Sequence, residues 1–476
     1  MKKILLIILL LSSSTIFILA GQNGGFINAS DFGFSPHASG IENMKALQKS
    51  VEHGGTIIIS KPGIYNIAGT VYLKSNTSLI FGNNTFLRKV DEMGSFSHVF
   101  LNEGALTKTF DNNITIDGLN IIVNDVDKIM TEVYGLRGQI AFFYIKDLKI
   151  TRFRCLDLGK AQFCIHICTF EDIIIDDAII KGKKDGIHLG RGKRFAIRNC
   201  VFDTYDDAIG LNGQDYVNSN PEMGWIENGV IENCYDMGGE DNIGNFCRML
   251  AGGWTDWQKG MEVQHSDAVI SNGCIYRVQM VPDGTVYKSQ TRPLHDEGNK
   301  VIDNINWSMM QTDVTYTAGV RNITFRNIFL EKARTGFAIH FDNNKFSRSY
   351  YPGAEIPIQK QLIFDNIKVC HNNKKDLMAI RTPVDNITIS SSVIGNTRIS
   401  FYENKAVMDY FKTNISFIGC TFLYDGSFTF LENKIKNKEI IVNTYSSMIV
   451  SENFKATINK GEGRIAINSD LIRLNE

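Results

Sequence analysis

Short runs of alternating apolar residues, separated by Asn, Gly or Asp, recur along most of this chain. One example is RFAIRNCVF at 194–202. Equivalent apolar places recur at an interval in the low twenties: Ile175 and Ile197 are 22 residues apart (197 − 175), and Ile363 and Ile387 are 24 apart (387 − 363). This repeat of strand-type runs, with no helical pattern between them, is typical of a solenoid, because one coil cannot bury its apolar face until another stacks on it.

The repeat therefore predicts an all-β fold, a parallel β-helix, over residues 70–476. Stacking of parallel coils pairs every strand edge except those at the two ends. An antiparallel sandwich is the alternative, but its strands usually come in hairpins with short turns. We favour the β-helix for this reason.

Residues 21–69 are expected to cap the first coil. Asn43 to Glu52 has an amphipathic helical pattern, and Gly54-Gly55 leads from it into an apolar run at 56–59. This order of helix, Gly-Gly and strand resembles the N-terminal cap of secreted right-handed parallel β-helix enzymes. The resemblance implies that the coils are right-handed.

Between about 240 and 310 the repeat is lost. Asn272-Gly273 and Asp283-Gly284 are pairs that favour hairpin turns, so this segment is expected to form a small antiparallel β insertion. All four tryptophans of the chain lie in or beside it: Trp225, Trp254, Trp257 and Trp307.

The charge balance and the first twenty residues indicate where the protein acts. Lys and Arg number 50 and Asp and Glu number 51, and a net charge of −1 gives no long-range attraction to nucleic acid. Residues 1–20 have two lysines followed by an apolar run, in the order of a secretory signal peptide. No later apolar run is long enough to span a bilayer. We therefore expect a protein of the periplasm or the cell exterior that is not inserted in a membrane.

Nine cysteines, an odd number, exclude a framework that pairs all of them within the chain. Four follow Asn or Gly near the end of an alternating run: Cys200, Cys234, Cys274 and Cys420. A small apolar residue at a repeated place indicates a packing position, so we expect unpaired, buried thiols.

Three aspartates stand at related places in the repeat. Asp185 is followed 21 residues later (206 − 185) by the pair Asp206 and Asp207. Both Asp185 and the pair come directly before a small residue and a run in which apolar residues alternate. Equivalent places on neighbouring coils stack at about 4.8 Å, so the three carboxylates are expected to cluster on one outer face. Like charges this close raise one another's pKa, and active sites are where such clusters usually occur. The alternative is that Asp185 and Asp206 are turn residues that bond local backbone N–H groups.

These aspartates resemble motifs of the polygalacturonase family, glycoside hydrolase family 28. That family carries Asn-Thr-Asp-Gly on one coil and Gly-Asp-Asp-Cys-Ile/Val-Ala on the next; the matches here are Asp185-Gly186, Asp206-Asp207 and Ile209, followed by Asn212-Gly213. Residues 320–343 also look like a later coil of the family.

The resemblance implies a glycosidase that cuts a polysaccharide or oligosaccharide without a metal or other cofactor. It assigns Asp206 as the general acid, and Asp185 and Asp207 as the pair that activates water. The implied reaction inverts the anomeric centre, which calls for carboxyls about 6.5–9.5 Å apart.

The chain departs from the family pattern at several places. Lys183-Lys184 stands where the family has Asn-Thr, and the family's Gly-His-Gly and its carboxylate-binding Arg-Ile-Lys are absent from the expected places, so a substrate other than a uronic acid is expected. His188 and Arg191 are candidates for the missing polar roles. Further candidates for contact with sugar are Asn212 and His340, which follow their strands, and the rings of Trp254 and Trp257, which could form a cleft wall or the core of the insertion.

Two other functions stay open. In a polysaccharide lyase on the same fold, the three aspartates would hold Ca²⁺ and Lys184 or Arg191 would abstract a proton. In a glycan-binding β-helix the aspartates would have no catalytic role. The sequence Cys164-Ile-His166-Ile-Cys168 is not expected to bind zinc, because alternate residues of one strand lie about 6.6 Å apart and cannot converge on one ion; an interior stack is expected instead.

Overall fold

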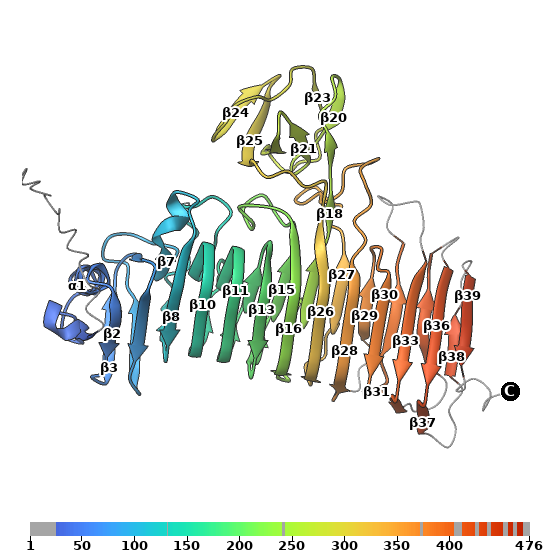
Figure 1. Ribbon diagram of the computed structural model, residues 1–476, viewed down its shortest axis with the longest axis horizontal. Coiled ribbons are helices and arrows are strands. Elements are labelled where there is room, and N and C mark those ends of the chain that lie inside the picture. The colour runs from blue at the N-terminus through green and yellow to red at the C-terminus, as the bar shows by residue number, and fades with distance from the viewer. Residues whose placement is uncertain are drawn as a thin grey trace, which may run out of the picture.

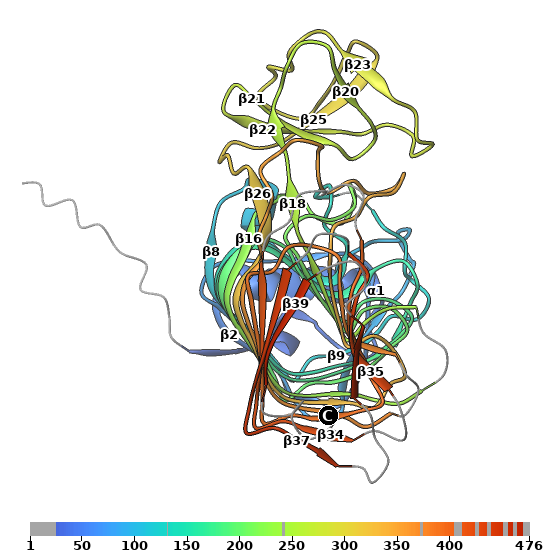
Figure 2. The ribbon, with the colours of Figure 1, turned by 90° about the vertical axis from the view of Figure 1, so that its right-hand side faces the viewer.

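A computed structural model describes residues 25–130, 132–239, 243–371, 375–403, 412–423, 428–435, 439–450, 456–459 and 464–469. The chain winds into one long stack of parallel coils, seen from the side in Figure 1 and along its axis in Figure 2. The predicted all-β fold, a right-handed parallel β-helix, is confirmed. The expected signal peptide, residues 1–20, lies outside the described residues.

Three ladders of parallel strands run along the stack. The first ladder, which carries the site described below, consists of β4 (Val71–Leu73), β7 (Phe100–Asn102), β12 (Ile187–Leu189), β15 (Ile209–Asn212), β17 (Cys247–Leu250), β27 (Phe337–His340), β29 (Asp376–Ile380), β32 (Arg398–Phe401), β35 (Phe428–Asn433) and β38 (Ala456–Asn459). Two long strands, β10 (Gly138–Leu158) and β11 (Phe163–Gly182), run through all three ladders.

The other two ladders complete each coil. The second consists of β1 (Phe26–Asn28), β2 (Gly55–Ile59), β5 (Thr77–Phe81), β8 (Asp111–Asp117), β13 (Gly192–Arg198), β30 (Asn386–Ser390), β33 (Thr413–Ile418), β36 (Glu439–Tyr445) and β39 (Arg464–Ser469). The third consists of β3 (Gly63–Ile67), β6 (Thr85–Lys89), β9 (Asn120–Ile122), β14 (Val201–Thr204), β31 (Val393–Gly395), β34 (Thr421–Leu423) and β37 (Met448–Val450). Three strands run through both: β16 (Trp225–Asp236), β26 (Thr317–Leu330) and β28 (Lys360–Val369).

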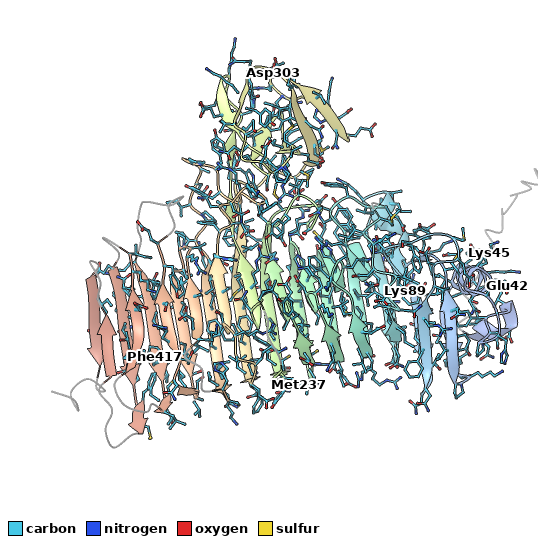
Figure 3. All side chains as sticks on the ribbon, turned by 180° about the vertical axis from the view of Figure 1, so that it is seen from behind. Glu42, Lys45, Lys89, Met237, Asp303 and Phe417 are labelled. Carbon is cyan, nitrogen blue, oxygen red and sulfur yellow. The ribbon has the colours of Figure 1, made fainter. Side chains whose placement is uncertain are left out.

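Alternation along each strand forms the core, and Figure 3 shows side chains along the whole stack, including the inward-facing Phe417. Ile175 stacks on Ile197, as their spacing predicts. The second expected pair is wrong by one residue. Leu362 stacks on Ile387, while Ile363 is 40% exposed, because Gln361 has a φ of 52° that shifts the alternation.

A column of asparagines marks the corner between the second and third ladders. Asn199, Asn233, Asn327 and Asn366 all have a φ between 52° and 55°, a left-handed conformation that Asn tolerates well. Each side-chain amide donates to the one on the coil before it, at 3.1, 2.9 and 2.7 Å along the column. The asparagines that punctuate the sequence repeat therefore shape and connect the corners.

At the N-terminal end, α1 (Gly40–Glu52) begins three residues before the helix expected from Asn43 and ends at the expected residue. Ser39 and Glu42 form a capping box at its start, and its apolar side packs on β2, β3 and β4. Two short 3-10 helices, η1 (Ala29–Phe32) and η2 (Glu103–Leu106), complete the helical elements of the described residues. No helix in this part of the chain is both long and apolar enough to cross a bilayer.

The segment after β17 leaves the coils as a separate β unit, which stands above them in Figure 1. Its strands form two sheets of their own: β19 (Thr255–Asp256), β21 (Ala268–Ser271), β22 (Cys274–Val278), β24 (Asn299–Ile302) and β25 (Ile305–Gln311) in one, β20 (Met261–Val263) and β23 (Tyr287–Ser289) in the other. Asp303 lies in its outermost part (Figure 3). The unit is joined to the coils at β18 (Gly252–Gly253), which pairs antiparallel with the start of β26.

The insertion buries its tryptophans. Trp257 and Trp307 pack with Val269 and Tyr276 in the core of the unit, and Trp254 packs in a neighbouring apolar cluster. Trp254 is 1% exposed and Trp257 is 8% exposed, so neither ring can stack on a sugar. The interpretation of these two rings as a cleft wall is wrong, because Trp257 is buried in the core of the unit and Trp254 is buried where the unit packs on Met223 and Ala318.

All nine cysteines are unpaired, and all except Cys274 and Cys370 are buried. The expectation of unpaired, buried thiols is therefore confirmed for Cys200, Cys234 and Cys420, and it is wrong for Cys274, which is partly exposed. The expected interior stack is confirmed only for Cys164, which lies in the main core. Ile167 faces that core, so His166 and Cys168 face outward and are buried beneath the segment 213–224.

Candidate active site

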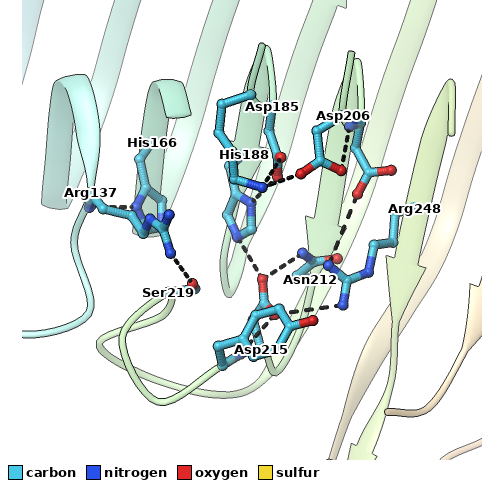
Figure 4. A network of polar contacts seen from close by, with 12 residues as sticks. Arg137, His166, Asp185, His188, Asp206, Asn212, Asp215, Ser219 and Arg248 are labelled. Carbon is cyan, nitrogen blue, oxygen red and sulfur yellow. Dashed lines mark hydrogen bonds and ion pairs between the residues drawn. The ribbon is translucent and has the colours of Figure 1, made fainter. Parts of the chain in front are cut away.

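The three aspartates lie on the turns that lead into two neighbouring strands of the first ladder. Asp185 precedes β12 and Asp206-Asp207 precedes β15, and the two strands pair with Ile187 opposite Ile209. The side chains meet, as the 21-residue spacing predicts (Figure 4). One oxygen from each carboxylate lies within 4.8 Å of the others, which is closer than the about 6.5–9.5 Å expected for an inverting pair.

Lys184 lies between two of these carboxylates. Its Nζ is 3.2 Å from Oδ1 of Asp185 and contacts Oδ2 of Asp206. Lys184, which departs from the polygalacturonase motif in the sequence, thus places a cation at the centre of the cluster. Burial lowers the pKa of Lys184, but the charges of Asp185 and Asp206 outweigh burial and raise the pKa, so the ammonium stays protonated.

The three carboxyls differ in their proton affinity. Burial alone would raise the pKa of Asp185, but the hydrogen bond from His188 and the charge of Lys184 outweigh it and hold the pKa well below its usual value. Burial, with the nearby charge of Asp185, raises the pKa of Asp207 to about 7 and also raises the pKa of Asp206. Near neutral pH the cluster therefore combines an ionised Asp185 with Asp207, a carboxyl that still retains its proton in part of the molecules.

His188 lies beneath Asp185. Its Nδ1 is 3.2 Å from Oδ2 of Asp185, and its Nε2 is 3.4 Å from Oδ2 of Asp215 (Figure 4). Its ring stacks on that of Phe163, with the ring centroids 4.1 Å apart. Gly210 on the next coil leaves space for the ring, since a Cβ there would lie 3.0 Å from Nδ1. His188 is fully buried, so it supports Asp185 and does not touch the substrate as the sequence suggested.

Asp215 comes from the segment 213–224, which folds back over the first ladder. It accepts a hydrogen bond of 2.9 Å from Nδ2 of Asn212. Asn220 of the same segment donates to the Asn212 carbonyl at 2.6 Å. Asn212 is buried by these contacts, so the structure makes it a support of the segment and contradicts its expected contact with sugar.

Arg248 on β17 closes the site on its other side. Its guanidinium is 4.0 Å from Oδ2 of Asp207, 3.6 Å from Asp215 and 2.9 Å from Asp342. Its Nε also donates to Nε2 of His340 at 3.2 Å. The structure thus places His340, half-buried, beside the cluster as expected.

Sequence reasoning missed Arg248 and Asp215. Arg248 stacks on Gly210, and Gly210 stacks on His188, so the three belong to one outward-facing column. His188 and Gly210 are 22 residues apart (210 − 188), whereas Gly210 and Arg248 are 38 apart (248 − 210), because two longer loops lie between the latter two. The uneven interval hides the column from a search for a period in the low twenties.

Buried polar contacts fix the turn that carries the aspartate pair. The backbone N–H and Nδ2 of Asn245 both donate to Oδ1 of Asp207 at 2.8 Å. Arg334, which is paired with buried Asp236 at 2.6 Å, donates to the Asp206 carbonyl, also at 2.6 Å. The turn that carries the aspartate pair is therefore held by the two coils that follow it.

Arg191 does not join this cluster. It lies at the far end of β12, where it donates to Thr169 at 3.2 Å and pairs with Glu222 at 3.2 Å and Asp313 at 2.6 Å. Asp185, Asp206, Asp207, His188, Asn212 and His340 gather at one place, whereas Arg191, Trp254 and Trp257 lie elsewhere. The aspartate cluster also has the oxygen donors that a hard divalent cation requires.

No family model and no curated protein matches this chain. Several solved structures share its fold. The catalytic unit of a GH87 α-1,3-glucanase from Streptomyces thermodiastaticus is 11% identical, with a TM-score of 0.54 over 94% of this chain and 69% of that one. A tailspike protein of E. coli bacteriophage HK620 is 10% identical, with a TM-score of 0.51 over 89% of this chain and 67% of that one.

An exopolygalacturonase from Thermotoga maritima is 12% identical, with a TM-score of 0.46 over 93% of this chain and 92% of that one. At identities of this size the comparisons show the fold alone. The chain shares the parallel β-helix architecture of the α-1,3-glucanase and the tailspike protein.

Proposed function

We propose that this protein is a glycoside hydrolase that cuts a polysaccharide or oligosaccharide with its aspartate cluster. The observation that carries the proposal is an ionised Asp185 in contact with two carboxyls of raised pKa, brought together from neighbouring coils. Glycoside hydrolysis needs one carboxyl that gives a proton and one carboxylate that accepts one, and surroundings that push the two pKa values apart supply both. The fold that the chain shares with an α-1,3-glucanase supports this substrate class.

Accessibility favours Asp206 as the general acid. Its side chain is 19% exposed, against 3% for Asp185 and 3% for Asp207, so it is the member that can reach a glycosidic oxygen. Asp185, which is ionised, accepts the proton of the attacking water, and Asp207 holds that water with it. The three carboxyls share their protons as one titrating group, so the proton that Asp206 delivers can be replaced from Asp207.

The inverting course requires the cluster to widen when substrate binds. Lys184 draws the carboxylates of Asp185 and Asp206 toward one cation. A sugar that accepts a hydrogen bond from Asp206 has to displace Lys184 from it, and the water then occupies the space between the two carboxylates. Proton NMR of the first product would show the inverted anomer; the retained anomer would instead make Asp185 a nucleophile.

We also propose that the enzyme acts in the periplasm or outside the cell, because residues 1–20 have the charge and apolar order of a signal peptide. Fractionation of cells that make the protein tests this, since cleavage near residue 20 and recovery outside the cytoplasm are expected. Retention of the full-length chain in the cytoplasm would contradict it.

The test of the reaction begins with a screen of the purified protein against pectic, algal and host glycans. On a glycan that is cut, Asp206→Asn should lower the rate by at least about 10²-fold while the unfolding transition stays unchanged. Asp172→Asn, at an exposed aspartate of the second ladder, is the matched control and should keep full activity. Full activity of Asp206→Asn would remove the proposed acid.

A Ca²⁺-dependent polysaccharide lyase is the second candidate, favoured by the three converging carboxylates. The raised pKa of Lys184 argues against it, because a protonated ammonium cannot abstract a proton. A lyase would leave an unsaturated, ultraviolet-absorbing end and lose activity with a chelator. The hydrolase should release saturated ends and keep its activity in the same assay, and release of no product at all would leave only glycan binding.

A further inference from the structure

A pocket separate from the aspartate cluster lies where the insertion returns to the coils. It has a volume of about 300 Å³. Neighbouring coils supply its floor and the segment 313–315, which leads from β25 to β26, supplies one wall. A volume of this size is in the range of pockets that bind small ligands.

Two aromatic rings lie among its lining residues, Phe110 just before β8 and Trp225 at the start of β16. The strand register places them on one corner column, four coils apart, a distance of roughly 19 Å at the usual strand spacing. Phe110 is 40% exposed and Trp225 is half-buried. A cation lies over each ring, Lys146 at 4.5 Å from that of Phe110 and Arg321 at 5.0 Å from that of Trp225, and the Phe110 ring also packs edge-on against Tyr144 at 5.1 Å. These contacts hold both rings in place in the lining of the pocket.

The floor between the rings carries acids and bases in alternation. Glu171, Lys193 and Glu227 follow one another in register on three coils, and Nζ of Lys193 is 3.3 Å from Glu171. Two carboxylates and one ammonium thus alternate along the row, so charges of the same sign are not adjacent. Sugar hydroxyls both donate and accept hydrogen bonds, whereas a strongly charged ligand would meet a like charge at every second place.

Arg191 and Asp313 connect the wall to the floor. Asp313 is paired with Arg191 at 2.6 Å, and Arg191 is held from below by buried Glu222 at 3.2 Å. Glu222 in turn accepts hydrogen bonds of 2.8 Å from Tyr144 and from Thr169. The pocket is therefore preformed, which lowers the cost of binding.

We propose that this pocket is an accessory site for a short run of uncharged sugar units of the glycan chain. The identity of the ligand rests on the proposed function, but the site does not share residues with the aspartate cluster. Asp185 and Arg191 stand before and after β12, six residues or about 20 Å of extended chain apart (191 − 185). A glycan held at the pocket would remain near the aspartate cluster between cleavage events.

Affinity electrophoresis tests the site without cleavage of the polymer. Protein that carries Asp206→Asn is run through gels that contain single neutral glycans or an anionic pectic polymer. Addition of Trp225→Ala should weaken retention by a neutral glycan roughly tenfold, the size of effect that loss of one good contact produces. Phe110→Ala is the second variant, and Tyr445→Ala, at a ring 54% exposed near the other end of the stack, is the control that should leave retention unchanged.

The outcomes separate this proposal from the proposed function. Unchanged retention of correctly folded Trp225→Ala and Phe110→Ala, retention by the anionic polymer alone, or no retention in any gel would overturn the accessory site even if the wild type hydrolyses glycans. Weakened retention in a protein that releases no product would support the site while removing the hydrolase.

Discussion

Asp206 and Asp207 are neighbours in the chain but lie in different surroundings. The Asp206 side chain reaches Lys184 at the surface of the site, whereas Asp207 is buried and accepts two hydrogen bonds from Asn245. At this scale the environment, and not the type of residue, decides which carboxyl can meet a substrate and which one binds a proton most tightly.

The buried carboxyl of Asp207 should destabilise the folded protein above neutral pH. Its pKa is about 7 in the folded state, above the ordinary value of 3.8, so the folded state binds an extra proton between about pH 4 and 7 and stability falls as the pH rises through that range. Asp207→Asn removes this dependence. We expect the free energy of unfolding at pH 8 to rise by up to about 4 kcal/mol, with little change at pH 4, in urea titrations. An identical pH dependence in the two proteins would contradict the raised pKa.

His188 should set the acidic limit of activity. His188→Phe keeps a ring against Phe163 but removes the hydrogen bond that lowers the pKa of Asp185. Because Asp185 must be ionised to accept a proton, the acidic limb of kcat/KM should move to higher pH by about one unit or more. Phe163→Leu retains the hydrogen bond and is the control. A loss of kcat with no shift of the limb would mean that His188 only supports the fold.

At the scale of the element, the asparagine corners decide how one ladder turns into the next. Each corner requires a left-handed residue, and Asn satisfies both the backbone and its neighbours along the column. Similar amide pairs join Asn76 to Asn113 and Asn228 to Asn322 at other corners. These contacts repeat along the stack and reinforce the pairing of the strands.

Substitutions of Asn233 should separate the contribution of the left-handed backbone conformation from that of the side-chain amide contacts. Asn233→Gly loses the amide contacts with Asn199 and Asn327 but adopts the φ of 54° freely. Asn233→Ala loses the same contacts and also strains the backbone, so it should lower the free energy of unfolding by about 1–2 kcal/mol more than Asn233→Gly. Urea unfolding of both variants measures the difference, and equal losses would show that the conformation of this corner carries no cost.

At the scale of the whole molecule, the insertion is an addition to a continuous stack. The coil strands on either side pair directly, β17 with β27 and β16 with β26, and the core of the insertion is separate from that of the coils. Gly253 and Thr317 are opposite one another in an antiparallel pair, so a short hairpin turn could replace everything between them.

Replacement of residues 254–316 by such a turn should leave a folded β-helix. We expect the β circular dichroism signal and one cooperative unfolding transition to persist, because the coils keep their ladder and core. Retention by neutral glycans should weaken, since Asp313 and its wall are lost. Aggregation or a non-cooperative transition would show that the coils depend on the insertion.

Local regularity in the chain predicted a large part of this protein. The repeat predicted the solenoid, and the distance between Asp185 and Asp206 matched the length of one short coil closely enough to predict their meeting. The solenoid and the meeting of the aspartates both follow from the constant spacing of stacked strands, because coils of similar length repeat at a regular interval in the sequence.

The tertiary structure alone decided what surrounds those carboxylates. Arg248 and Asp215 reach the cluster from coils of unequal length. Trp257 is buried in the core of the insertion, and Trp254 is buried where the insertion meets the coils. Side-chain burial and long-range charge contacts depend on how the long loops between strands fold over the surface of the coils. The spacing of residues along the chain does not determine how these loops fold.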